Sequence, residues 1–280
     1  MSEIVVNSEV NPVKRSAFDK RIHEIDFVRG ILIILVIIDH IFCFTNNYTS
    51  DWMSLPGYEW MKNINNVTDF YWTSLARTII RQLALFGFCF TSGVSCAFSK
   101  NNWKRAGQLL VVAFVLAIVT NIINAVMDFG SGGASMAITF NVIAVLGCSV
   151  LMYCFVQDKS NRSLWTLFLI TVLISIWFIP FIDSNSKIRE NAILLPFFNP
   201  EEYGFPQGDY MPLFPYSIAF FLGALFARYF YKEKKSLLPK YEFERPICFV
   251  GRHTLIIYVT HALIIIGVLA LIDVIIRSSL

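Results

Sequence analysis

The feature that most constrains this chain is a succession of apolar runs, each about 20 residues long. A helix of that length crosses the roughly 30 Å of hydrocarbon in a bilayer. Apolar residues make up 56% of the chain and charged residues only 15%, against about 25% charged residues in a soluble domain. Because a water-soluble fold of 280 residues could not bury so much apolar surface, the sequence predicts an all-α, polytopic bundle of membrane helices.

About seven runs are long enough to cross. The predicted spans lie near residues 27–45, 76–98, 106–126, 136–156, 164–182, 212–231 and 253–276. A further apolar stretch, residues 191–198, is too short to cross and is expected to be interfacial or re-entrant. No small-residue cleavage site follows the first run, which is therefore interpreted as an uncleaved signal anchor. We expect a cytoplasmic tail over residues 1–26 and a single transmembrane domain over residues 27–280.

The basic residues predict how the helices are oriented. With the N-terminus placed in the cytoplasm, the inner segments hold 17 of the 23 Lys and Arg residues and the outer segments hold 4. Lys and Arg accumulate on the cytoplasmic side of membrane proteins, so we expect a cytoplasmic N-terminus and an outer C-terminus. The two long outer segments, residues 46–75 and 183–211, are rich in Trp, Tyr, Asn, Pro and Gly. They are expected to form an ordered lid over a site.

Net charge and cysteine positions narrow the functional classes. A formal net charge of +3 is too small to indicate a nucleic-acid-binding protein. The six cysteines lie in or beside apolar spans and show no C-x-x-C spacing. This pattern favours buried small hydrophobic residues, and we predict neither a metal site nor a structural disulfide.

Ionisable residues inside the first run point to function, since each costs about 2.5–3.5 kcal/mol at the bilayer centre. Arg29 and His40 are 11 residues apart, which at 100° per residue puts them on one helix face, about 16 Å apart along the axis. Asp26 lies one turn from Arg29 and can pair with it. The alternative interpretation of His40 is a core histidine bonded to a neighbouring carbonyl group.

The second run carries two arginines near its outer end. Asp39 points about 100° away from His40, and its expected partner on a neighbouring helix is Arg77 or Arg81. For these arginines, snorkelling to the outer interface and binding of an anion are both open. The segment TSGVS, residues 91–95, is a patch of small residues that lets helices approach closely.

The last run presents a second histidine. Thr254, Tyr258 and His261 are spaced by 4 and 3 residues and therefore share one helix face. His261 lies near the midplane of its span, so we expect it to meet His40 in one central cavity. The cytoplasmic entrance to that cavity would be basic and suited to a phosphate-bearing ligand. The residues expected at this entrance are Arg29, Arg252 and either Lys104 or Arg105.

Five segments, in order along the chain, carry a family resemblance. They are RIHEIDFVRGILIILVIIDH, LARTIIRQLALFGFCFTSGVS, ITFNVIAVLGCSVLM, GDYMPLFPYSIAFFLGALFARY and FVGRHTLIIYVTHALII, and they run from residue 21 through nearly the whole chain. Together they resemble the bacterial branch of the heparan-α-glucosaminide N-acetyltransferase catalytic-domain family. The pair Arg29-Gly30, with a histidine 11 residues after the arginine, is also similar to transmembrane acyltransferases that acetylate surface sugars.

The resemblance implies a multi-pass enzyme of the bacterial plasma membrane. It would take an acyl group from cytoplasmic acetyl-CoA, or a similar donor, and deliver it to a hydroxyl or amine on the far side. The resemblance makes His40 the catalytic histidine, places Arg29 and Asp26 on the donor side, and adds Asp209 and His261 as further site residues.

Taken together, these expectations assign a role to each candidate residue. The catalytic candidates are His40, Asp39 and His261; the donor-binding candidates are Arg29, Asp26, Arg252, Lys104 and Arg105; the acceptor-binding candidates are Arg77, Arg81, Asp209 and Tyr258. The expected partners are acyl-CoA, a sugar or small amine or hydroxyl acceptor, and the lipid bilayer, with a homodimer as a candidate assembly. His40 would either take the acceptor's proton or carry the acyl group itself.

Two other functional classes stay open at this point. The first is a transporter or channel for a small polar solute or anion, in which the histidines relay protons. No convincing internal repeat of the kind found in many transporters is apparent, and the odd number of spans and the long outer segments favour an enzyme. The second is a structural membrane subunit without activity, against which the polar face at His40 argues.

Overall fold

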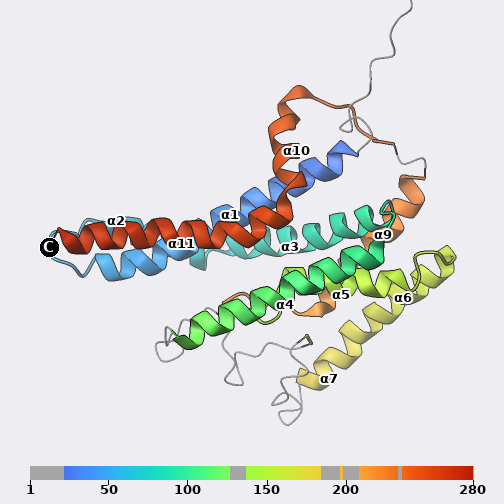
Figure 1. Ribbon diagram of the computed structural model, residues 1–280, viewed down its shortest axis with the longest axis horizontal. Coiled ribbons are helices and arrows are strands. Elements are labelled where there is room, and N and C mark those ends of the chain that lie inside the picture. Colours follow the sequence, from blue (N-terminus) through green and yellow to red (C-terminus); the bar gives the residue numbers. More distant parts are fainter. Residues whose placement is uncertain (1–21, 127–136, 184–195, 198–207, 233–234, 280) are drawn as a thin grey trace, which may run out of the picture.

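A computed structural model describes residues 22–126, 137–183, 196–197, 208–232 and 235–279, and every regular element in these ranges is a helix (Figure 1). The predicted all-α fold is confirmed for this part of the chain. In chain order the elements are α1 (His23–Trp52), α2 (Met61–Thr73), α3 (Leu75–Cys96), α4 (Asn102–Val126), α5 (Val142–Cys154), α6 (Asn161–Leu173), the π-helical η2 (Ile174–Phe178), α7 (Ile179–Asp183), α9 (Leu213–Phe230), the 3₁₀ turn η5 (Glu242–Glu244), α10 (Arg245–Arg252) and α11 (Thr254–Ser278).

Six stretches of helix are long and apolar enough to cross a membrane. They are His23–Trp52, Leu75–Cys96, Asn102–Ala125, Asn161–Phe181, Leu213–Phe230 and Thr254–Ser278. The remaining predicted span corresponds to α5, whose 13 residues extend only about 20 Å at 1.5 Å per residue. A non-helical segment, residues 137–141, precedes it. Where about seven spans were expected, the described residues thus contain six apolar helices long enough to cross and one shorter apolar helix, α5.

The start of α1 and the end of α11 lie at opposite ends of the molecule. In Figure 1 the first turns of α1 lie beside α10, whereas α11 ends at the far tip. The expected separation of the two termini across a membrane stays a prediction. Which end faces the cytoplasm stays a prediction.

Large apolar side chains cover the outer faces of several helices. Phe114 on α4, Leu169 on α6 and Leu263 on α11 are each more than half exposed. Contiguous apolar surface on this scale is not stable in water, whereas lipid covers it without cost. The six apolar helices therefore indicate a multi-pass membrane protein.

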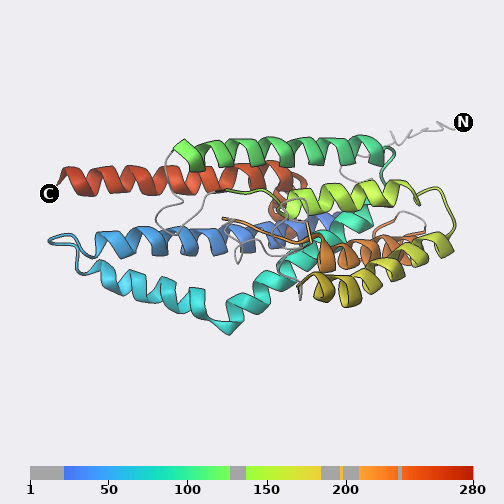
Figure 2. The ribbon, with the colours of Figure 1, turned by 90° about the horizontal axis from the view of Figure 1, so that it is seen from below.

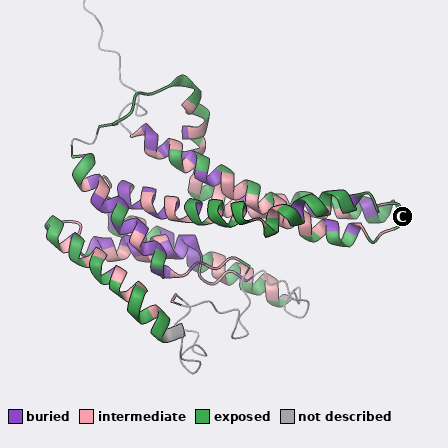
Figure 3. Ribbon diagram, turned by 180° about the vertical axis from the view of Figure 1, so that it is seen from behind, coloured by how far each residue is buried: buried purple, intermediate pink, exposed green. Residues whose placement is uncertain are grey.

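The buried core lies where α3, α5 and α9 pack together, as the concentration of buried residues in Figure 3 shows. α3 and α9 are in close contact because each has a glycine against the other's backbone. A Cβ atom added at Gly93 would lie 1.9 Å from the carbonyl oxygen of Phe220, and one at Gly223 would lie 2.0 Å from that of Phe90. The close approach predicted for the small-residue patch TSGVS is confirmed at Gly93.

α10 crosses α1 near its start through a second pair of glycines. A Cβ atom at Gly30 would lie 2.1 Å from a carbonyl oxygen of α10, and one at Gly251 would lie 1.8 Å from a carbonyl oxygen of α1. Each glycine is next to an arginine in sequence, Arg29 before Gly30 and Arg252 after Gly251. The crossing therefore brings two cationic side chains to one end of the bundle.

The first predicted lid segment is helical. α1 continues beyond the expected end of its span, and α2 runs back along it to the bend that joins α2 to α3 (Figure 2). Side chains join the two helices, because Thr49 donates to Asn65 at 3.0 Å and Thr68 donates to Asn46 at 2.8 Å. The second lid segment and the predicted interfacial stretch lie mostly outside the described residues.

Candidate active site

Two histidines from opposite ends of the sequence meet between α1 and α11. The ring centroids of His40 and His261 are 4.7 Å apart, and the rings are nearly perpendicular at 88°. His40 is half-buried, whereas His261 is only 7% exposed. The predicted meeting of the two side chains is confirmed, because α1 and α11 pack along each other.

Both histidines use Nδ1 for a bond to their own helix. Nδ1 of His40 lies 2.9 Å from the carbonyl oxygen of Val36, and Nδ1 of His261 lies 2.7 Å from that of Tyr258. A neutral imidazole that donates through Nδ1 presents Nε2 as an acceptor. Nε2 of His261 is buried and has no hydrogen-bond partner among the described residues. The carbonyl bond considered as the alternative for His40 is therefore present, and it leaves the second nitrogen available for chemistry.

A tyrosine–aspartate pair lies one turn from His261. The hydroxyl group of Tyr258 donates to a carboxylate oxygen of Asp209 at 2.7 Å. The segment that carries Asp209 precedes α9, and its backbone N–H groups on either side donate to carbonyl groups of residues 137–140, at 2.8 and 3.0 Å. The non-helical segment before α5 thus fixes Asp209, and the structure brings Asp209, Tyr258 and His261 together.

Asp39 forms a two-pronged ion pair with Arg77. Nε and Nη2 of Arg77 lie 2.7 and 3.1 Å from the two carboxylate oxygens, and the hydroxyl group of Tyr71 donates to the same carboxylate at 3.1 Å. The guanidinium group also lies 3.5 Å above the ring of Trp72. Of the two partners expected for Asp39, Arg77 rather than Arg81 is confirmed. Binding of an acceptor by Arg77 stays a prediction.

Arg81 lies one turn after Arg77 on α3, near two tyrosines rather than Asp39. It is half-buried and within electrostatic reach of Tyr258 and Tyr216. The hydroxyl group of Tyr216 in turn donates to Gln82 at 2.6 Å. Arg81 is therefore the arginine nearer to the tyrosine–aspartate pair, whereas Arg77 is held by Asp39.

Two arginines from different helices converge on consecutive residues of α3. Arg29 on α1 donates to the carbonyl group of Thr91 at 3.1 Å, and Arg105 on α4 donates to the hydroxyl group of Ser92 at 3.0 Å. Lys104 is exposed. Of the two basic residues of α4 considered for the entrance, Arg105 is the one that points into the bundle.

A third arginine joins this end of the molecule from α10. Nε of Arg252 lies 3.3 Å from a carboxylate oxygen of Asp26. Asp26 is one turn from Arg29 on α1, so the glycine-mediated crossing of α10 and α1 gathers Arg252 near the other cations. The structure gives Asp26 an ion pair with Arg252, and its expected pair with Arg29 stays a prediction.

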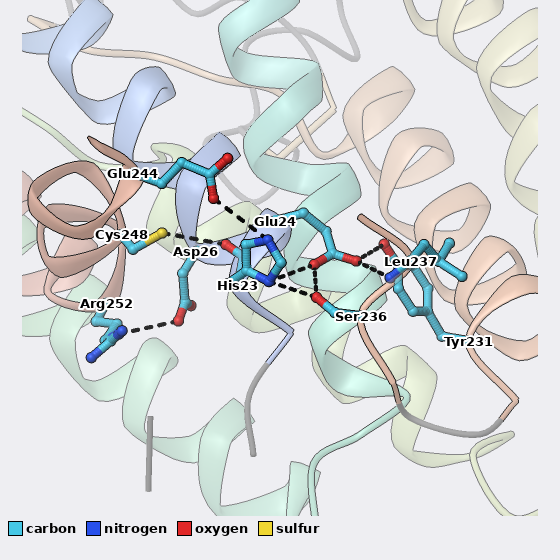
Figure 4. Close-up of polar contacts among 9 residues, drawn as sticks. All are labelled: His23, Glu24, Asp26, Tyr231, Ser236, Leu237, Glu244, Cys248 and Arg252. Carbon is cyan, nitrogen blue, oxygen red and sulfur yellow. Dashed lines mark hydrogen bonds and ion pairs between the residues drawn. The ribbon is translucent and has the colours of Figure 1, made fainter. Parts of the chain in front are cut away.

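The sequence did not reveal a further polar group at the start of α1. His23 and Glu24 are buried there and contact Ser236 and Glu244, more than 200 residues away in sequence (Figure 4). Both belong to the expected tail, although α1 begins at His23. The only signal was a pair of ionisable residues just before an apolar run, and such a pair ordinarily lies in solvent.

Within the described ranges, no three His, Cys, Asp or Glu side chains are grouped as metal ligands would be. All six cysteines are unpaired.

Comparison with known families identifies the chain. The family model described as heparan-alpha-glucosaminide N-acetyltransferase, catalytic, matches residues 21–263. Searches of curated proteins and of solved structures gave no match. Because the matched range covers most of the chain, the protein belongs to this family, as the five quoted segments predicted. Membership implies a membrane acetyltransferase.

Proposed function

We propose that this membrane acetyltransferase takes an acetyl or other short acyl group from cytoplasmic acyl-CoA. It transfers the group to an amine or hydroxyl, most simply that of a sugar, on the outer side of the membrane. The proposal is supported by two sets of polar groups at different depths along α1. The arginines lie near its start, and the histidines lie about 16 Å further along the helix axis, a distance that the pantetheine arm of CoA can span.

The arginine set suits the phosphate groups of CoA. Arg29, Arg105 and Arg252 come from three helices, and arginine binds phosphate oxygens through paired N–H groups. Asp26 holds Arg252 at 3.3 Å, which limits the freedom of that side chain before a ligand arrives. Lys104, exposed at the same end, would add attraction at longer range.

The histidine set suits general base catalysis. As the acceptor nitrogen or oxygen attacks the thioester carbonyl carbon, Nε2 of His40 takes the proton that the acceptor loses. The tetrahedral intermediate then collapses and the C–S bond breaks. The leaving CoA thiolate receives that proton from His40, so the products are the amide or ester and free CoA. The Asp39–Arg77 ion pair leaves little net charge next to His40.

The second histidine and the tyrosine–aspartate pair would orient the acceptor. Nε2 of His261 offers a buried lone pair beside His40, suited to accepting a hydrogen bond from the acceptor. Asp209, Tyr258 and Arg81 offer a carboxylate, a hydroxyl group and a guanidinium group on the same side. A sugar amine or hydroxyl can bond to all three types of group.

A covalent route uses the same geometry. In it, Nε2 of His40 attacks the thioester first, CoA leaves, and the acceptor then takes the acyl group from the histidine. This route predicts ping-pong kinetics and an acyl-enzyme that can be trapped without acceptor. Direct transfer predicts that both substrates must bind before any product forms.

The observation that carries the proposal is the contact of His40 with His261, whose buried Nε2 has no hydrogen-bond partner in the described part of the chain. The test is a reaction of the purified protein in proteoliposomes with isotope-labelled acetyl-CoA and a panel of acceptors: an amino sugar, a neutral sugar and a simple amine. Mass spectrometry should find the label on at least one acceptor. His40→Ala should abolish the transfer, while His253→Ala, which changes an exposed histidine, should leave it intact. Full transfer by His40→Ala would contradict the assignment.

A further inference from the structure

The start of α1 holds a polar cluster that the proposed reaction does not use. It consists of His23, Glu24, Ser236 and Glu244, called here the N-terminal cluster (Figure 4). His23 and Glu24 are only 6% and 7% exposed. They lie about 25 Å from His40 along the helix axis, too far to touch the reacting atoms.

Glu24 fastens the segment between α9 and α10 to α1. Its carboxylate accepts from the backbone N–H of Leu237 at 2.7 Å, from the hydroxyl group of Tyr231 at 3.1 Å and from the hydroxyl group of Ser236. Burial and the neighbouring Glu24 raise the pKa of Tyr231, so this hydroxyl group stays protonated and remains a donor. A buried carboxylate with three donors is well satisfied, and it holds the start of the connecting segment at Tyr231 and its middle at Ser236 and Leu237.

His23 extends the same fastening to α10. Its Nδ1 lies 2.7 Å from the hydroxyl oxygen of Ser236, and its Nε2 lies 3.5 Å from a carboxylate oxygen of Glu244, the last residue before α10. The thiol group of Cys248 on α10 also donates to the backbone carbonyl of His23, at 3.5 Å. One residue of α1 thus contacts the loop before α10, the turn that begins it and the helix itself.

The far end of α10 carries Arg252. There Gly251 lies against the backbone of Asp26, and Arg252 pairs with the carboxylate of Asp26, whereas Gly30 packs against Ile247 in the first turn of α10. α10 has only 8 residues, so a short helix is held to α1 by glycine contacts along its length and by polar contacts at its start. The position of Arg252 depends on both attachments.

We propose that the N-terminal cluster positions Arg252 for the acyl donor, with His23 and Glu24 as positioning residues. The inference rests on the proposed function, because it takes Arg252 as a ligand of the CoA phosphates. Without the cluster, α10 keeps its glycine contacts but loses the polar contacts that hold η5 and the preceding segment to α1. Arg252 then samples more positions, and a donor must pay the entropy of ordering it. The histidines lie on a different part of the bundle and keep their geometry.

The test compares donor binding and kinetics across matched variants. Glu24→Gln keeps the shape of the side chain but weakens the acceptor, Ser236→Ala removes one hydroxyl group, and Glu242→Gln changes an exposed carboxylate of the neighbouring turn. We expect Glu24→Gln to raise the KM and the Kd for acyl-CoA about tenfold and Ser236→Ala about threefold. Glu242→Gln should change neither. In the two cluster variants, kcat at saturating donor and KM for the acceptor should stay within twofold of the unmodified protein.

A double variant separates positioning from general destabilisation. If Glu24 acts through Arg252, the Glu24→Gln/Arg252→Gln protein should bind CoA no more weakly than Arg252→Gln alone. Additive losses, or a fall in kcat with donor affinity unchanged, would overturn the positioning role. If Glu24→Gln does not fold, Ser236→Ala takes its place. CoA binding by Ser236→Ala, by Arg252→Gln and by the double variant then tests the positioning role in the same way.

Direct titration with CoA distinguishes this proposal from the one on which it rests. If the unmodified protein does not bind CoA, the proposed function itself fails. If it binds CoA and both cluster variants bind equally well, only the positioning role fails.

Discussion

His261 and His23 are buried to nearly the same degree, yet their surroundings are opposite. His261, 7% exposed, has a nitrogen without a partner among the described residues. His23, 6% exposed, has a hydroxyl group and carboxylates at its two nitrogens. A buried polar atom left without a hydrogen bond costs about 1–3 kcal/mol. The free nitrogen of His261 is open to a ligand or a reaction, whereas both nitrogens of His23 contact side chains that hold elements in place.

The largest effect expected from this comparison is on activity at His261. His261→Leu removes the unpartnered nitrogen and replaces it with an apolar side chain. We expect kcat to fall about a thousandfold, within the range of a lost proton-transfer or orienting group, with no loss of stability. Acyl transfer in proteoliposomes and unfolding by SDS in bicelles measure the two quantities. If His261→Leu keeps its activity and loses more than about 1 kcal/mol of unfolding free energy, then His261 has a structural role and not a functional one.

The Asp39–Arg77 pair lies beside the histidines, but its polar groups are paired, as the two nitrogens of His23 are. Asp39→Asn should cost about 3 kcal/mol of unfolding free energy, because it leaves a mostly buried guanidinium without its counter-ion. Adding Arg77→Gln should restore about 1–2 kcal/mol. A double-mutant cycle measured by SDS unfolding gives this coupling. Additive effects would show that the two charges do not stabilise one another.

In the N-terminal cluster, a histidine-to-leucine substitution should lower stability and leave activity unchanged, the reverse of the effect expected at His261. His23→Leu deprives Ser236 and the two glutamates of a partner, so we expect a loss of about 1–2 kcal/mol of unfolding free energy. At saturating acyl-CoA, kcat should stay within about twofold, since His40 is about 25 Å away. Unchanged stability in His23→Leu would show that the polar contacts of the His23 ring do not stabilise the fold.

The smallest effect is expected at the tyrosine–aspartate pair. Tyr258→Phe removes one hydrogen bond to Asp209 and should raise KM for the acceptor about fivefold, which corresponds to roughly 1 kcal/mol. KM for the donor should not change. Tyr229→Phe is a suitable control, because Tyr229 is exposed and its hydroxyl group accepts a hydrogen bond from Trp165 on α6. A shift in donor KM alone would place Tyr258 with the donor instead.

Helical spacing was sufficient to predict the centre of the candidate site. The face shared by Arg29 and His40, and the face shared by Tyr258 and His261, follow from 100° per residue. The rule that ionisable groups in membranes face the bundle interior then predicted that the two histidines meet. It also limited the partner of Asp39 to two residues, of which Arg77 is found.

Other parts could not be predicted because their stabilising contacts are distant in sequence. Residues 46–52 were predicted to belong to the first lid segment, yet α1 continues through them because Thr49 and Asn46 bond to α2. α5 is shorter than its apolar run, since residues 137–141 pair instead with the segment before α9. The N-terminal cluster joins residues more than 200 positions apart, and no local pattern marks such a contact.

The interlocked glycines of α1 and α10 also have a consequence for natural variation. Even an alanine at Gly30 or Gly251 would bring a Cβ atom to about 2 Å from the facing backbone, so either exchange must push the two helices apart. The same shift would carry the adjoining Arg29 or Arg252 away from its place. We therefore expect the pair Arg29 and Gly30 and the pair Gly251 and Arg252 to be retained or lost together among related sequences. Relatives that lose one of the two glycines should also have replaced the arginine on the opposite helix.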